Sequence, residues 1–321
     1  MSSTTRPRGV LGEGIYVPTL TFFKDDQGQS LDIGTHKRHI LWMARAGVHG
    51  FLLQGSTAEA VAINREERIE LIKVTRQLLD ENGFQRLLII AGAGAQSTLE
   101  AVTLSIDAAN AGADYVIVLS PGYFASSITP EANEGFYREV ADYSPIPVII
   151  YSYPSASGGL EISSDSVVSL AKHPNIVGIK QTDHNVGKMA RIVYQVKKDQ
   201  SDFVVLGGAS EYLVGALAVG ASGVITGAAN ICPRAVMKLY HLWLEGKSEE
   251  ARNLQGMLSV GEGALLTGGI PAIKAAAQLF LGRGGVPRRP VPPPSEALIS
   301  TLKVKYAPLY ELEQRLEAQE A

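Results

Sequence analysis

A lysine ends one of the apolar runs of the chain, in a position that suits a nucleophile. Residues 175–180 read Asn-Ile-Val-Gly-Ile-Lys, and polar residues follow Lys180 at once. A strand that buries this run draws the amine away from water, which disfavours its charged form. Burial can lower a lysine pKa from roughly 10.4 to about 7 or 8, so that the neutral amine attacks a carbonyl carbon. The alternative is an ion pair between Lys180 and a carboxylate on a neighbouring strand.

Two other apolar runs end in groups that suit a keto acid. One run ends at Tyr151, whose phenol could pass protons to and from a carbinolamine or merely fill the protein interior. Another run leads into a turn in which Gly55 precedes the hydroxyls of Ser56 and Thr57. Such a turn, with its backbone N–H groups, is suited to holding a carboxylate, although it could equally be an ordinary turn.

Further runs end in an aromatic pair and in small residues. Tyr123 and Phe124 follow the run at 115–119, and aromatic residues on a loop often mark a binding site or an interface. The run that contains Ile225 ends in a threonine and a glycine, which leaves room for a ligand.

Other chemistry-bearing residues carry weaker signals. The glycine-rich residues 92–95 could cradle a phosphate, but no basic residue follows them and a plain turn is expected. His36 and His39 lie three apart in a basic segment without a carboxylate at ligand spacing, so we expect a solvated helix face. The chain has no nucleophile-elbow serine and no zinc-type histidine pair, which argues against a hydrolase, a metalloenzyme or a metal site.

The apolar runs themselves are short and continuous, which is typical of strands buried on both faces of a parallel sheet. Amphipathic stretches separate them, such as residues 65–79, a predicted helix with Arg68 outside and Ile72 inside. Alanine and glycine stop three of these helices just before a strand, as at Gly112. The predicted strands are residues 15–21, 50–53, 87–91, 115–119, 147–151, 176–180, 203–207 and 223–226.

Eight strands that alternate with helices predict an α/β fold, a closed (β/α)8 TIM barrel with a C-terminal helical extension. A doubly wound open sheet is the alternative. We expect an N-terminal tail at residues 1–13, the barrel at 14–246 and the helical extension at 247–321. Active sites of such barrels lie at the carboxyl ends of the strands, where Lys180 and Tyr151 are predicted to meet.

The extension has its own pattern of helices and prolines. Residues 248–266 and 270–281 are helical in pattern, and a last helix is expected from residue 295. Between them, the proline-rich residues 287–294 have no helix-compatible pattern and are predicted to be an extended strap over the barrel.

The bulk composition excludes several classes of partner. The 321 residues include 29 Lys and Arg against 32 Asp and Glu, and a net charge of −3 disfavours binding to nucleic acid or anionic lipid. The single cysteine, Cys232, cannot form an intrachain disulfide. No stretch is apolar over the ~20 residues that a membrane span requires, and the N-terminus is polar, so we expect a soluble, cytoplasmic protein.

Several of these residues together resemble the pattern of the dihydrodipicolinate synthase and N-acetylneuraminate lyase family, and the resemblance covers nearly the whole chain. It implies a class I aldolase that acts on pyruvate or releases it, with an aldehyde as second substrate and with no metal or organic cofactor. It also implies a homotetramer built from tight dimers. The residues that carry the resemblance are the turn at 55–59, Tyr123, Tyr151, the strand end at 178–180 and the late segment at 284–290.

The resemblance assigns a role to each candidate residue. Lys180 stands at the position of the Schiff-base lysine, and Tyr151 at that of the proton-relay tyrosine. Ser56 and Thr57, in the turn that Gly55 opens, fall where the family binds the pyruvate carboxylate. Tyr123 falls where a tyrosine reaches across a dimer interface to complete the relay, and Ile225 where a backbone carbonyl lines the pyruvate pocket.

Three departures from the family pattern bear on the substrate. Ala58 replaces a common glycine, and Gly122 replaces the first of two usual loop tyrosines, so the pocket wall near Tyr123 should differ. Ala156 stands where dihydrodipicolinate synthases carry an arginine that binds the carboxylate of aspartate semialdehyde. Loss of such a charge-assisted contact costs on the order of 2 to 5 kcal/mol, which argues against synthase activity.

The expected reaction is therefore cleavage or formation of a 2-keto-4-hydroxy acid, such as 4-hydroxy-2-oxoglutarate or a 2-keto-3-deoxy sugar acid. Synthesis of 4-hydroxy-tetrahydrodipicolinate is the alternative within the family. A catalytically silent barrel that only binds a keto acid is the alternative of another class.

Overall fold

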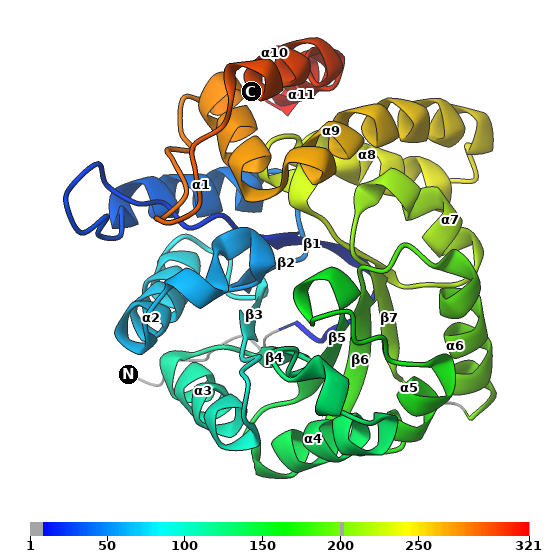
Figure 1. The fold of residues 1–321 in the computed structure, drawn as a ribbon. Coiled ribbons are helices and arrows are strands. Elements are labelled where there is room, and N and C mark those ends of the chain that lie inside the picture. The colour runs from blue at the N-terminus through cyan, green and yellow to red at the C-terminus, as the bar shows by residue number, and fades with distance from the viewer. Residues whose placement is uncertain (1–8, 200–201, 321) are drawn as a thin grey trace, which may run out of the picture.

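The computed structural model describes residues 9–199 and 202–320, and within them eight parallel strands close into one barrel in sequence order (Figure 1). The strands are β1 (Gly14–Pro18), β2 (Gly50–Leu53), β3 (Leu88–Gly92), β4 (Tyr115–Leu119), β5 (Val148–Ser152), β6 (Ile176–Gln181), β7 (Val204–Gly207) and β8 (Gly223–Ile225). The helices around them are α1 (Ile33–Arg45), α2 (Arg65–Glu81), α3 (Thr98–Ala111), α4 (Pro130–Tyr143), α5 (Ser164–Leu170), α6 (Val186–Lys198), α7 (Leu213–Ala218) and α8 (Pro233–Leu244).

Closure of the sheet confirms the predicted TIM barrel. Strand β1 pairs with β8, with Tyr16 opposite Ile225, so the sheet has no open edge and the doubly wound alternative is wrong. Strand β1 ends three residues earlier than predicted because the backbone N–H of Leu20 donates to the Asn230 side chain instead of continuing a ladder. Leu20 is nevertheless buried, which explains why the apolar run outlasts the strand.

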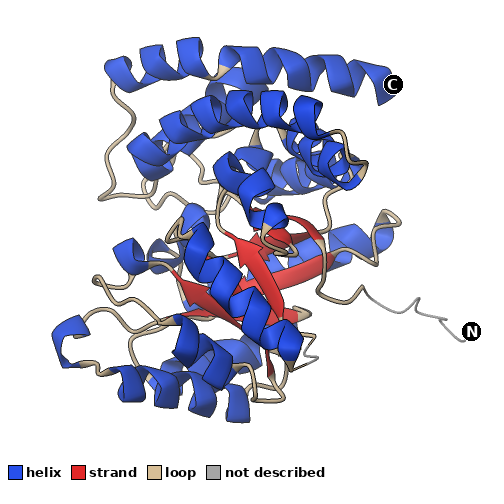
Figure 2. Cartoon of the chain, turned by 90° about the vertical axis from the view of Figure 1, so that its right-hand side faces the viewer, coloured by secondary structure: helices blue, strands red, loops and turns tan. Residues whose placement is uncertain are grey.

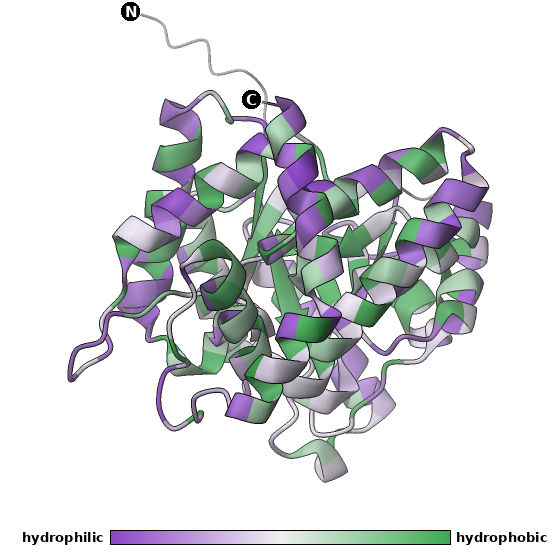
Figure 3. Cartoon of the chain, turned by 90° about the horizontal axis from the view of Figure 1, so that it is seen from above, coloured by the Kyte–Doolittle hydropathy of each residue, from purple (hydrophilic) through white to green (hydrophobic). Residues whose placement is uncertain are grey.

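Each strand buries both of its faces, as the continuous apolar runs indicate. On β5, Ile149 and Tyr151 belong to the cluster inside the barrel, whereas Ile150 packs into the larger cluster between barrel and helices. Figure 3, coloured by hydropathy, shows hydrophobic strands at the centre, whereas the surrounding helices alternate between hydrophilic and hydrophobic residues. The chain direction then brings the polar residues that follow every strand to one end of the barrel.

Polar side chains on α1 and α2 are less exposed than the sequence suggests. His36 and His39 are buried, so the predicted solvated face is wrong: His36 Nε2 lies 2.8 Å from Thr75 Oγ1, and His39 Nε2 lies 3.2 Å from Asn230 Oδ1. Burial lowers the pKa of His36 to about 4 and that of His39 to about 3. Arg68, expected outside, is half-buried because its guanidinium donates to backbone carbonyls of Ala60 and Gly92.

The C-terminal helices lie against one side of the barrel and stack beside its helices (Figures 1 and 2). The two helices predicted at 248–266 and 270–281 are segments of α9 (Ser248–Leu281), which is broken at Gly269. By length and composition α9 could cross a membrane, which corrects the expectation that no stretch is apolar enough. However, its kink and its buried Glu262 and Lys274 are features of a helix packed within a protein.

The end of the chain is anchored by charged side chains. The last helix expected from residue 295 is present as α10 (Glu296–Lys305) and α11 (Ala307–Glu320). Glu313 of α11 is buried and accepts hydrogen bonds from the backbone N–H groups of Arg234 and Ala235 at the start of α8. The proline-rich strap crosses to the segment after β2, where Arg288 donates to the Ala62 carbonyl and forms an ion pair with Glu67 at the start of α2.

The division of the chain at residues 13 and 246 stays a proposal. The barrel strands begin at Gly14, and the loop between α8 and α9 contains residue 246. Of the proposed tail, residues 1–8 lie outside the described part of the chain.

Candidate active site

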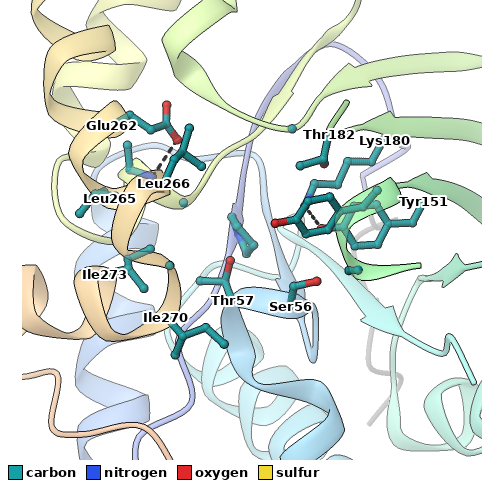
Figure 4. Close-up of a pocket in the computed structure, with 17 residues that line it drawn as sticks. Ser56, Thr57, Tyr151, Lys180, Thr182, Glu262, Leu265, Leu266, Ile270 and Ile273 are labelled. Carbon is teal, nitrogen blue, oxygen red and sulfur yellow. Dashed lines mark hydrogen bonds between the residues drawn. The ribbon is translucent and has the colours of Figure 1, made fainter. Parts of the chain in front are cut away.

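Lys180 and Tyr151 meet at the carboxyl end of the barrel. They are register partners on β6 and β5, so their side chains point to the same face of the sheet. The Nζ atom of Lys180 donates to the Tyr151 hydroxyl at 3.1 Å and lies 4.3 Å from the centre of the Tyr151 ring (Figure 4). Lys180 is 3% exposed, and its amine faces a phenol rather than a carboxylate within the described chain.

A cavity of about 260 Å³, here called the Lys180 cavity, lies beside this pair. Ser56 and Thr57 line the same cavity, so the structure brings four of the predicted side chains around one space (Figure 4). The full lining is Pro18, Ser56, Thr57, Tyr151, Tyr153, Ala156, Lys180, Thr182, Gly208, Gly227, Ala228, Glu262, Leu265, Leu266, Gly269, Ile270 and Ile273.

The turn after β2 is built from tight local hydrogen bonds. The backbone N–H of Ala58 donates to the Gly55 carbonyl at 3.1 Å, and that of Glu59 donates to the Ser56 carbonyl at 3.0 Å. Thr21 Oγ1 donates to the Ala58 carbonyl at 2.7 Å, which ties the turn to the segment after β1. This framework holds the Ser56 and Thr57 side chains at the cavity.

Three predicted site residues do not line the Lys180 cavity. Gly55 lines a second cavity of about 350 Å³, which shares Ser56 and Tyr151 with the first. Ile225 is fully buried inside the barrel, in the same cluster as Tyr151. Tyr123 is 80% exposed on the loop after β4 and stacks edge to face on Phe124.

Gly122 and Ala156, two positions at which the chain departs from the family pattern, lie on loops that contact each other. A Cβ atom on Gly122 would lie 2.3 Å from the backbone carbonyl carbon of Ser157, so glycine lets the loop after β4 pack on the loop after β5. Ala156, in that second loop, is exposed and lines both cavities. Small residues therefore meet where these two loops touch, and Ala156 lies at the junction of the two cavities.

Two polar residues of the cavity, Thr182 and Glu262, were not predicted from the sequence. Thr182 Oγ1 is shielded from solvent and has no hydrogen-bond partner among the described residues. Its place two residues after Lys180, just past the end of β6, was a usable signal, because alternate residues of an extended chain point the same way. Glu262 accepts hydrogen bonds from Ser210 and Thr226 at 2.6 and 2.7 Å, and burial raises the pKa of its carboxyl group. No local pattern marks Glu262, because α9 follows the barrel.

A charged network holds the segment after β6. Lys188 Nζ is buried 2.8 Å from Asp183 Oδ2 and 3.2 Å from Glu161 Oε1. Burial opposes ionisation of Asp183, but hydrogen bonds from Gln181 and Lys188 lower the pKa of its carboxyl group. Within the described ranges, no group of three or more His, Cys, Asp or Glu is placed to hold a metal ion.

Comparison with known proteins identifies the class. The chain matches the Dihydrodipicolinate synthetase family over residues 12–305 and belongs to this family. It is an aldolase-type carbon–carbon lyase of that family.

Among its relatives is a protein from Emericella nidulans named as a mitochondrial 4-hydroxy-2-oxoglutarate aldolase, 42% identical over 95% of this chain and 97% of the relative. An L-threo-3-deoxy-hexylosonate aldolase from Hypocrea jecorina is 36% identical over 94% and 98%. The solved structure of a dihydrodipicolinate synthase family protein from Coccidioides immitis superposes with a TM-score of 0.86, at 35% identity over 97% and 99% of the two chains.

The relatives correct the expected location. Relatives from Emericella nidulans and Coccidioides immitis are named as mitochondrial proteins, so the prediction of a cytoplasmic protein is wrong. That prediction rested on a polar N-terminus and on the absence of a membrane span. Neither feature separates the cytoplasm from the mitochondrion, because mitochondrial targeting segments are themselves polar and rich in arginine and serine.

Proposed function

We propose that this enzyme cleaves or forms a 2-keto-4-hydroxy acid, such as 4-hydroxy-2-oxoglutarate or a 2-keto-3-deoxy sugar acid, through a Schiff base on Lys180. The observation that carries the proposal is the buried Lys180 amine, 3.1 Å from the Tyr151 hydroxyl and on the same cavity as Ser56 and Thr57. The names of the relatives from Emericella nidulans and Hypocrea jecorina support this substrate class.

In the proposed mechanism, Ser56 and Thr57 bind the carboxylate of the keto acid and place its C2 carbon at Lys180. The neutral amine adds to C2, and the Tyr151 hydroxyl carries the proton to the former carbonyl oxygen, which forms a carbinolamine. Loss of water leaves an iminium cation. Proximity supplies much of the rate, because the cavity fixes both groups before the reaction.

The iminium then draws electrons from the bond between C3 and C4. The C4 hydroxyl loses its proton, the C3–C4 bond breaks, and the aldehyde leaves. The enamine that remains gains a proton at C3, and water hydrolyses the iminium to release pyruvate and the free lysine. The condensation of pyruvate with an aldehyde follows the same steps in reverse.

The cavity composition argues against the synthase alternative. Ala156 lines the cavity where that reaction would need a cation for the carboxylate of aspartate semialdehyde. Thr182, whose hydroxyl has no partner within the described part of the chain, instead suits a hydroxylated or carbonyl-bearing second half of the substrate. A coupled assay with pyruvate and aspartate semialdehyde tests the alternative, and robust turnover there would favour the synthase.

Borohydride trapping tests the Schiff base. Reduction in the presence of pyruvate should add a three-carbon group to the peptide that contains Lys180, as read by mass spectrometry. Lys188 and Lys274 are equally buried and serve as internal controls that should stay unmodified. Full aldolase turnover by a Lys180→Ala variant would overturn the mechanism. Trapping without retro-aldol turnover on any 2-keto-4-hydroxy acid would favour the silent keto-acid-binding barrel.

We also propose a mitochondrial location and a homotetramer made of dimers, in which Tyr123 reaches the partner's site. Tyr123 and Phe124 are 80% and 67% exposed, and the Tyr123 backbone N–H is held by the Gln96 side chain. Val61 and Leu99 are also strongly exposed, and Val61 lines the second cavity together with Gln96. Light scattering should give the mass of an oligomer, and Phe124→Glu should reduce that mass; a monomeric wild-type protein would contradict the proposal.

A further inference from the structure

A buried ion pair joins the turn after β2 to the C-terminal half of α9. Lys274 Nζ lies 2.5 Å from Glu59 Oε1, and the two residues are 0% and 2% exposed. Each partner makes a further bond, Lys274 to the residue just before the proline-rich strap and Glu59 to the strap itself. Lys274 Nζ donates to the Val286 carbonyl at 2.9 Å, and Glu59 Oε2 accepts from the Arg288 backbone N–H at 2.7 Å. The pair therefore joins the turn after β2 to two segments of the C-terminal extension that are distant from it in sequence.

Glu59 belongs to the same turn as Ser56 and Thr57. It has a left-handed conformation with φ of 58°, which is uncommon for a residue other than glycine, asparagine or aspartate. Its N–H donates to the Ser56 carbonyl. A residue keeps such a conformation only when its surroundings hold it there. The bonds of its side chain to Lys274 and Arg288 supply that restraint.

Lys274 links Glu59 to α9, which forms the opposite wall of the cavity. It lies one turn beyond Ile270 on α9, and Ile270 and Ile273 line the Lys180 cavity on the side of Thr57 (Figure 4). The ring of Phe23 covers the pair, with Lys274 Nζ 4.5 Å and the Arg288 guanidinium 4.2 Å from its centre. The pair is thus shielded from water, and its length sets the spacing between the turn and α9.

Stability alone does not explain a pair of this kind. Removing two charges from water is costly, and replacing a buried pair with apolar side chains is often neutral for stability or favourable. A buried pair has a directional geometry that apolar contacts lack, and here it fixes a strained residue two positions from Thr57.

We propose that Glu59 and Lys274 are positioning residues for the keto-acid carboxylate. They act through the backbone of the turn on Ser56 and Thr57, so the inference rests on the proposed function of these two hydroxyls. Loss of the pair should loosen the turn and weaken binding of the keto acid, with a smaller effect on the chemical step at Lys180. Because small misplacements in a site can cost up to about 100-fold, we expect the half-saturating pyruvate concentration to rise about 10- to 100-fold.

The test compares Glu59→Gln, Lys274→Met and the double variant Glu59→Gln/Lys274→Met in the full chain. The readouts are Tm and the pyruvate concentration that gives half-maximal borohydride trapping at Lys180. Lys274→Met leaves Glu59 buried without its cation and should lower Tm most. The double variant removes both charges and should recover much of that Tm, yet its half-saturating pyruvate concentration should stay raised.

Return of both values to the wild-type level in the double variant would overturn the proposal, because the pair would then act only on stability. Arg234→Met is a matched control: it breaks a buried pair with Glu313, neither residue of which lines the Lys180 cavity, and should lower Tm without changing pyruvate binding. Failure of the wild-type protein to trap pyruvate at Lys180 would instead overturn the proposed function, so the two failures are distinct.

Discussion

At the residue scale, the site depends on which polar groups stand next to one another on adjacent strands. Tyr151 and Lys180 are register partners, and their side chains touch because neighbouring parallel strands lie about 4.8 Å apart. Ser56 and Thr57 come from a strand on the other side of the barrel and meet them only across the cavity. The role of each side chain in such a site is tested by substituting that side chain alone.

Tyr151→Phe removes the hydroxyl that is 3.1 Å from Lys180 Nζ and keeps the ring. Because a positioned acid or base contributes about 10²- to 10⁴-fold, we expect kcat to fall by that factor while pyruvate is still trapped at Lys180, more slowly. Steady-state assays of pyruvate release measure the effect. Tyr194→Phe, an exposed position on α6, is the control, and an unchanged kcat for Tyr151→Phe would exclude the relay.

Ala156→Arg tests the selectivity that the rim imposes. Ala156 is exposed and lines both cavities, so a longer side chain there can reach the second half of the substrate. A guanidinium should favour aldehydes that carry a carboxylate, and kcat/KM for aspartate semialdehyde should rise about tenfold or more relative to a neutral aldehyde. Ala156→Gln has similar reach without charge. An equal gain with Gln would show that charge is not the cause.

At the element scale, the break in α9 shapes the cavity. Gly269 has φ of 60° and ψ of −142°, a conformation essentially restricted to glycine. The break lets Glu262 and Leu265 before it, and Ile270 and Ile273 after it, face the same cavity. The break therefore changes the direction of α9 between the two parts of the cavity wall that it forms.

The effect of a glycine-to-alanine substitution in α9 on stability should therefore depend on its position. Gly269→Ala forces a side chain into the glycine-only conformation and should lower the free energy of unfolding by about 1–3 kcal/mol, with a loss of aldolase activity. At Gly256 of the same helix an added Cβ atom meets open space. Gly256→Ala should therefore raise the free energy of unfolding by about 0.5–1 kcal/mol. Urea unfolding and pyruvate-release assays give both values. Equal effects at the two positions would contradict the role of the break.

At the scale of the whole molecule, a titratable contact joins the last helix to the side of the barrel. Burial raises the pKa of Glu313 to about 7, although the N–H groups of Ala235 and Arg234 and the Arg234 charge oppose the shift. Tyr306 and Cys232 are buried nearby, and Glu317 shares the Arg234 guanidinium. The bonds of Glu313 to the start of α8 join the last helix to the barrel.

This contact predicts the sign of a pH effect on stability. A carboxyl group whose pKa is higher in the folded state binds more protons there than in the unfolded chain, so stability falls as pH rises from about 4.5 to about 7. Integration over this shift gives a change on the order of 2–3 kcal/mol. Glu313→Gln should remove this slope in urea titrations from pH 5 to pH 8. A variant with the wild-type slope would show that other groups cause it.

Several features of the fold and site follow from local sequence. Continuous apolar runs predicted the barrel strands to within a few residues, because a strand buried on both faces has no polar alternation. Lys180, Tyr151, Ser56 and Thr57 come together because the carboxyl ends of parallel strands meet at one end of a barrel. Their catalytic roles stay predictions until the trapping and substitution experiments are done.

Other features could not be predicted in this way. His36 and His39 look like a solvated face, yet they are buried against Thr75 and Asn230, residues of other elements. Arg68 is half-buried for a similar reason. The pattern of one helix indicates which face is polar, but not which distant polar groups will satisfy that face.

The sequence by itself determined the barrel and the strand ends from which Lys180, Tyr151, Ser56 and Thr57 reach the site. These depend on contacts between neighbours in sequence and on the geometry of a closed parallel sheet. Only the tertiary structure decided that α9 forms one wall of the cavity, that Glu262 lies in it, and that Lys274 pairs with Glu59. The physical reason is that these contacts join residues more than 200 positions apart, or elements outside the barrel repeat, whose docking depends on packing of the whole chain.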